Sequence, residues 1–87
     1  MFDKDAMKRT TFTADRKYFI RAEAKWTKPA VGSARIAMRA EVFEGSPTIP
    51  GNEMIHLVGG VADTFDLLDA LQSAEAMARR YIAALER

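Results

Sequence analysis

Two stretches of the chain, residues 18–26 and 34–42, carry an apolar residue at every second position. A period of two is typical of a β-strand with one buried face. The segment between them contains Pro29, which cannot donate to a strand ladder, and Gly32, which favours a turn. The pattern therefore predicts an antiparallel hairpin whose apolar side chains share one face.

The charges on the opposite face select the register of this hairpin. If Trp26 pairs with Ile36, Arg21 lies opposite Glu41, whereas a shift by two residues places Arg21 opposite Arg39. A favourable cross-strand pair contributes roughly 0.2–1 kcal/mol, and like charges directly opposite one another are destabilising. The sequence therefore predicts the register that pairs Trp26 with Ile36.

In this register the outer face of the hairpin combines aromatic and basic side chains, because Phe19 faces Phe43 and Glu23 faces Arg39. No catalytic or ligand-binding motif of comparable strength occurs elsewhere in the chain. We therefore expect this face to be the interaction surface, with the members Phe19, Arg21, Arg35, Arg39, Phe43 and His56.

Three interpretations of this outer face remain open. The first is a contact with a protein partner or a second copy, because paired phenylalanine rings often bury against another subunit. The alternative is single-stranded RNA or DNA, since exposed aromatic rings among basic residues can stack bases. The net charge of +1 gives no global attraction to nucleic acid. In the third, residues 1–16 of the same chain cover the face.

A third strand is predicted for residues 53–58, before Gly59 and Gly60 break or bend it. Both of its faces carry apolar side chains, so alternation alone does not say which face is buried. We assign Ile55 and Leu57 to the core, which places His56 on the outer face. The turn-rich segment 45–52 before this strand is expected to be a mobile loop.

The period changes from two to that of a helix at Asp66. Apolar residues then recur at helical spacing, which predicts an amphipathic helix of about twenty residues. Asp66 and Asp69 lie near its start, where negative charge is favoured. The predicted buried stripe consists of Leu67, Leu71, Ala74, Ala78, Tyr81 and Leu85.

Residues 1–16 form a polar arm in which residues 8–13 are a candidate edge strand, and residues 17–87 form one β-β-β-α domain. The predicted class is α+β: an antiparallel meander of three strands, or four if the arm contributes one, with one long C-terminal helix on one face. Three strands and one helix make a thin core. A second copy could cover the apolar surface that this chain leaves exposed, so we expect a small interaction module that forms a homodimer through the outer sheet face or through an exposed sheet edge.

Composition narrows the chemistry further. The chain has no cysteine and one histidine, His56, so thiol catalysis and histidine-rich metal sites are unsupported. Asp63, Asp66 and Asp69 recur every third residue, unlike the alternate ligands of a calcium loop. We therefore expect no enzymatic activity, cofactor or metal. The start of the chain has no signal-like apolar run and no stretch has the length of a membrane span, which favours the cytoplasm.

Overall fold

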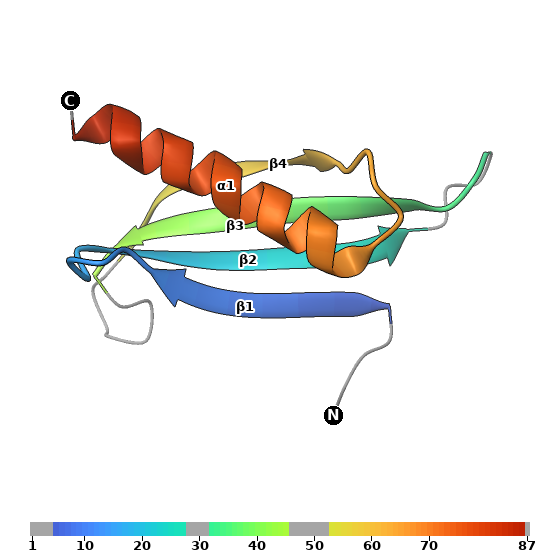
Figure 1. Cartoon of the computed structure of the whole chain (residues 1–87), viewed down its shortest axis with the longest axis horizontal. Coiled ribbons are helices and arrows are strands. Elements are labelled where there is room, and N and C mark those ends of the chain that lie inside the picture. Colours follow the sequence, from blue (N-terminus) through green and yellow to red (C-terminus); the bar gives the residue numbers. More distant parts are fainter. Residues whose placement is uncertain (1–4, 28–31, 46–52, 87) are drawn as a thin grey trace.

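Four consecutive strands pair in chain order, and one helix covers one face of the resulting sheet (Figure 1). The computed structural model describes residues 5–27, 32–45 and 53–86. The α+β class is confirmed, and the N-terminal arm supplies the fourth strand. The elements are β1 (Ala6–Phe12), β2 (Tyr18–Thr27), β3 (Arg35–Glu44), β4 (Met54–Val61) and α1 (Leu67–Leu85).

The register between β2 and β3 is the predicted one. Trp26 pairs with Ile36, and Arg21 pairs with Glu41. The apolar set of each strand therefore points to the same side, where Ile20 and Ile36 are fully buried. The opposite set, which includes the two charged side chains, forms the outer face. Local alternation and cross-strand charge agree here, which is why this pairing follows from the sequence.

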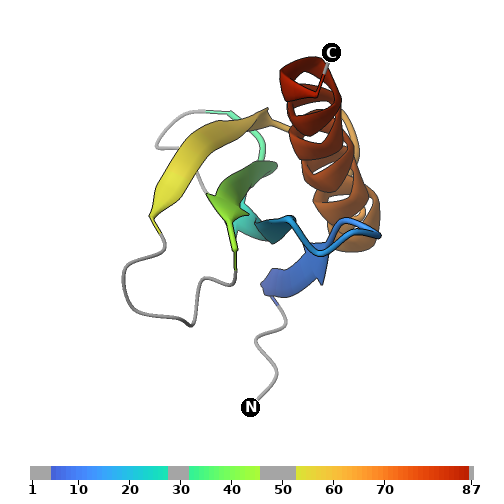
Figure 2. The ribbon, with the colours of Figure 1, turned by 90° about the vertical axis from the view of Figure 1, so that its left-hand side faces the viewer.

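Small side chains bring α1 close to the sheet. The helix packs mainly on β2 and β3, and it crosses the sheet diagonally with its C-terminal end toward β4 (Figure 1). Figure 2 shows it as a layer on one side of the twisted sheet. Because an alanine presents a single methyl group, the two layers approach closely along these residues. The fully buried alanines are Ala22, Ala24 and Ala40 on the sheet and Ala70, Ala74 and Ala78 on the helix.

The helix begins at an aspartate cap. Asp66 has an extended backbone, and its side chain accepts a hydrogen bond of 2.9 Å from the backbone N–H of Leu68. This bond satisfies one of the amide groups that have no partner inside the first turn. Asp69 adds negative charge to that turn. Ordinary helix-start chemistry thus accounts for both carboxylates.

The N-terminal arm lies in the sheet and not over its outer face. Residues 6–12 pair with β2 along their whole length, and Arg9 reaches across the inner face to Glu75 of α1. Glu75 is 6% exposed, and it is the buried residue with a charged side chain among the described ones. The pair links the edge strand to the helix. The interpretation in which the N-terminal arm covers the outer face is therefore wrong for residues 5–16, the part of the arm that the structure describes.

The predicted core face of the last strand is also wrong. His56 pairs with Val42 and Val58 pairs with Ala40, so His56 and Val58 face α1. Leu57 is 50% exposed on the other side. A register irregularity at Val42/Phe43 accompanies this pairing. Both faces of β4 carry apolar residues, so alternation within the strand does not determine which face is buried. The pairing of β4 with β3 determines it.

Gly59 and Gly60 do not end β4, which continues to Val61. A Cβ atom on Gly59 would lie 3.0 Å from the carbonyl oxygen of Met38. The glycine therefore permits a close approach of β4 to β3 instead of breaking the strand. The loop 45–52, predicted to be mobile, lies outside the described residues beyond Gly45.

Filling the alanine contact should destabilise the fold. Ala74→Leu inserts three carbon atoms where helix and sheet meet, and we expect it to lower the free energy of unfolding by about 1–3 kcal/mol. Ala83→Leu makes the same change on the exposed side of α1 and should change stability by less than about 0.5 kcal/mol. Urea denaturation of both variants measures the difference. Equal stabilities would contradict the close packing.

The Arg9–Glu75 pair predicts an order of stabilities. Arg9→Met leaves a buried carboxylate without its partner, whereas Glu75→Leu leaves a guanidinium whose side chain is 42% exposed and can be hydrated. We expect Arg9→Met to be the more destabilising variant in thermal unfolding. The double variant Arg9→Met/Glu75→Leu should recover much of the loss because it replaces both charges with apolar groups. The reverse order for the two single variants would contradict the burial of Glu75.

Candidate interaction surface

Ion pairs occupy the centre of the outer sheet face. Arg21 donates two hydrogen bonds to the Glu41 carboxylate, of 3.1 and 3.2 Å. Arg39 lies 3.9 Å from Glu23 and 3.8 Å from Glu41, and Lys8 of β1 lies 3.2 Å from Glu23. We call these five residues the outer charge cluster. Each basic side chain of the cluster has a carboxylate neighbour, so the cluster presents no unpaired positive charge.

The Arg21–Glu41 contact has an electrostatic consequence for both groups. The hydrogen bonds from Arg21 hold the pKa of the Glu41 carboxyl below its usual range, and the positive charges of Arg21 and Arg39 add to this effect. The same hydrogen bonds raise the pKa of the Arg21 guanidinium. Charge on each partner thus stabilises charge on the other.

The predicted aromatic pair is present but largely covered. Phe19 pairs with Phe43 across the strands, yet Phe43 is only 6% exposed, and the guanidinium of Arg21 lies 5.1 Å from its ring centroid. Phe12 of β1 adds a third ring, 5.8 Å from Phe19. The sequence alone does not reveal the place of Phe12 on this face, because it depends on the pairing of β1 with β2. Of the three rings, Phe43 is buried and Phe12 is 46% exposed, so Phe12 is the ring most accessible to a stacked base.

The remaining predicted surface residues lie apart from this cluster. His56 is on the helix-covered face, where its ring stacks on Tyr81 at 3.6 Å between centroids. Its expected position on the outer face is therefore wrong, because the register of β4 on β3 pairs His56 with the inward-facing Val42. Arg35 lies at the start of β3, with its guanidinium 5.7 Å from the ring of Phe65. The structure brings together Phe19, Arg21, Arg39 and Phe43 from the predicted set.

The two most exposed apolar side chains of the sheet, Leu57 and Val61, belong to β4, one of its two edge strands, while Phe12 of the other edge, β1, is 46% exposed. Ile55 is 40% exposed, Leu57 50% and Val61 63%. No residue of β4 carries a formal charge, whereas the opposite edge, β1, contains Lys8 and Arg9. Charged side chains on an edge strand discourage pairing with another chain. The two edges of this sheet thus differ in the charged side chains that discourage the addition of another strand.

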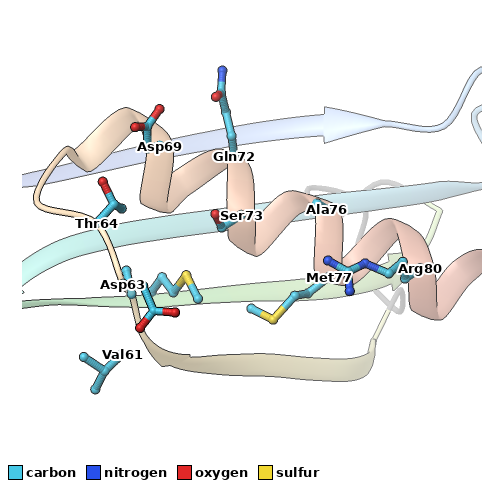
Figure 3. A pocket seen from close by; sticks show the side chains of 11 residues that line it. Val61, Asp63, Thr64, Asp69, Gln72, Ser73, Ala76, Met77 and Arg80 are labelled. Carbon is cyan, nitrogen blue, oxygen red and sulfur yellow. The ribbon is translucent and has the colours of Figure 1, made fainter.

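An open groove of about 650 Å³ lies between α1 and residues 61–64, where β4 ends and the chain leads toward the helix (Figure 3). Met38 and Met77 line it with apolar surface, and its ionisable lining residues are Asp63, Asp69 and Arg80. Asp63 and Arg80 lie toward different ends of the groove in Figure 3. The groove exists because α1 packs mainly on β2 and β3 and leaves the far edge of the sheet less covered.

The Glu41 contact predicts a pH dependence of stability. Because its folded pKa is lowered, the pair stabilises the fold fully above the ordinary glutamate pKa of about 4.3 and loses this effect as the pH falls through the folded value. Glu41→Gln should reduce the free energy of unfolding by less than about 1 kcal/mol at pH 7. The difference from the unmodified chain should shrink toward pH 3.

Denaturant unfolding at several pH values measures this difference, and Glu44→Gln is the control because Glu44 is exposed at the end of the same strand. A difference for Glu41→Gln that stays constant from pH 7 to pH 3 would contradict the charge pairing.

Within the described residues, no three side chains of the metal-ligating types gather into a site. No helix in those parts of the chain has an apolar stretch long enough to cross a membrane. The candidate site is the exposed β4 edge together with the groove beside it. No protein-family model, curated protein or solved structure matches the chain.

Proposed function

We propose that this chain is a non-enzymatic interaction module that self-associates by pairing its β4 edge with β4 of a second copy. The observation that carries the proposal is the contrast between the two sheet edges. β4 is uncharged, eight residues long and exposes large apolar side chains, while β1 contains Lys8 and Arg9. An edge strand of the first kind presents unpaired backbone groups to any compatible strand.

A second copy is a suitable partner for this edge. Two copies of β4 can pair without bringing formal charges into opposition, because the strand has none. The net charge of +1 per chain adds little long-range repulsion between copies. Pairing one strand from each copy buries a modest area, and small interfaces are typical of transient complexes. We therefore expect a dissociation constant in the micromolar range, on the order of 1–100 μM.

Self-association through the outer face has weaker support. The outer charge cluster would have to lose its hydration in such a contact, and the loss is costly even for paired charges. Phe43 is already covered within its own chain. Leu57 instead lies on the outer face next to the edge, so strand pairing would bury it without displacing the cluster.

Single-stranded nucleic acid remains the second candidate function, with less support from the geometry. The basic residues of the outer charge cluster are paired with carboxylates, and Phe43 is buried beneath the guanidinium of Arg21. Fluorescence anisotropy with single-stranded oligonucleotides at low salt tests it. Binding that weakens steeply with salt would favour this function over the one proposed.

The edge proposal predicts a concentration-dependent dimer that a charge on β4 disrupts. In sedimentation velocity, the unmodified chain should shift from monomer to dimer as its concentration rises through the micromolar range. Leu57→Lys should remain monomeric, because it places a charge in the paired edge. Thr10→Lys adds the same charge to β1, the other edge, and should dimerise like the unmodified chain.

As a control, circular dichroism should be used to check that each variant is folded. A chain that stays monomeric at all concentrations up to about 500 μM would exclude the proposal, given the affinity expected for such an interface. A dimer that Leu57→Lys leaves intact and Phe19→Ser dissociates would place the contact on the outer face instead of the edge.

A further inference from the structure

We infer that two copies meet in antiparallel orientation with Gly59 at the symmetry axis, so that Arg80 of each copy pairs with Asp63 of the other across the groove. This inference rests on the proposed self-association. To that proposal it adds a register, an orientation and a specific charged contact, and each of the three can be tested separately.

The register follows from the side-chain period of a strand. Directly opposed residues of an antiparallel pair lie on the same face, so the axis must pass through a residue of β4. An axis at Gly59 places Leu57 opposite Val61 of the second copy, and this contact occurs twice by symmetry. These are the two most exposed apolar side chains on the outer side of β4. Such cross-strand apolar contacts stabilise a pair of strands.

The neighbouring registers are less favourable. An axis at Leu57 places Val61 opposite Glu53 of the second copy, which sets a carboxylate against an apolar side chain. An axis at Val58 places Leu57 opposite Gly59, which has no side chain to contact. The axis at Gly59 is the register of these three in which Leu57 and Val61 meet.

The same register aligns opposite charges on the helix side. The backbone continues beside β3 past the end of β4, since the N–H of Ala62 donates to the carbonyl of Ile36 at 2.8 Å. Asp63 lies beyond the end of β4 and lines the groove beside α1, and in this register it lies level with Ile55 of the other copy. Ile55 precedes His56, and His56 stacks on Tyr81, the residue after Arg80. Arg80 and Asp63 of different copies are thereby brought to the same end of one groove.

Within a single copy, these two residues lie toward different ends of the groove (Figure 3). In an antiparallel pair the two grooves run in opposite directions. The Arg80 end of each groove therefore lies beside Asp63 of the second copy. The proposed dimer is therefore complementary in charge, and its affinity should fall as ionic strength rises.

Cysteine cross-linking tests the register, and the absence of native cysteine makes the result unambiguous. The double variant Leu57→Cys/Val61→Cys should form a disulfide-linked dimer under mild oxidation. Neither single variant should do so, because each cysteine then lies opposite an apolar residue. Positions 57 and 61 are too far apart along one strand to form a disulfide within a chain. Efficient linkage of Leu57→Cys alone would overturn the register in favour of an axis at Leu57.

Charge reversal tests the contact between Arg80 and Asp63. Arg80→Glu and Asp63→Lys should each weaken the dimer by roughly three- to tenfold, because each acts at two symmetric contacts. The double variant Arg80→Glu/Asp63→Lys should return to within about twofold of the unmodified chain. Arg79→Glu is the matched control, since Arg79 is exposed and does not line the groove.

The outcomes separate the inference from the proposed function. If the unmodified chain never dimerises, self-association itself fails. If the chain dimerises and Leu57→Lys dissociates it, but Arg80→Glu behaves like Arg79→Glu and the double variant shows no rescue, self-association stands and the inferred charged contact is wrong.

Discussion

The pairing of β2 with β3 is the constraint on which the rest of this structure depends. Because side chains alternate with a period of two, one register sends the small apolar residues to the helix side and the charged residues to the other side. The resulting alanine contact allows α1 to lie close to the sheet. The opposite face gains the ion pair between Arg21 and Glu41. A shift by one residue would exchange the two faces and remove both features.

The two strands added to this hairpin differ in chemistry, and that difference leads to the functional proposal. β1 contains charged residues, which discourage strand addition, and it is tied to α1 through Arg9 and Glu75. β4 has no charge, exposes Leu57 and Val61, and borders an open groove. A thin sheet covered by one helix thus leaves a single edge suited to pairing with a further strand, and we propose that a second copy supplies it.

The sequence predicts the hairpin, its register and the helix, because the determinants of each lie within a few residues or in directly opposed charges such as Arg21 and Glu41. It does not predict the buried face of β4, since apolar residues occur on both sides and the choice depends on pairing with β3. The predicted outer position of His56 is therefore wrong. The covering of Phe43 by Arg21 and the groove beside α1 also depend on how distant elements pack, which residue spacing alone does not encode.

Amide hydrogen exchange measured as a function of protein concentration tests the central claim most directly. The amides of β4 that point away from β3 are exposed in the monomer and hydrogen-bonded in the proposed dimer. We predict that exchange at β4 slows as the concentration rises through the micromolar range, while exchange along β1 stays constant. Exchange at β4 that does not depend on concentration, or equal slowing at both edges, would contradict self-association through this strand.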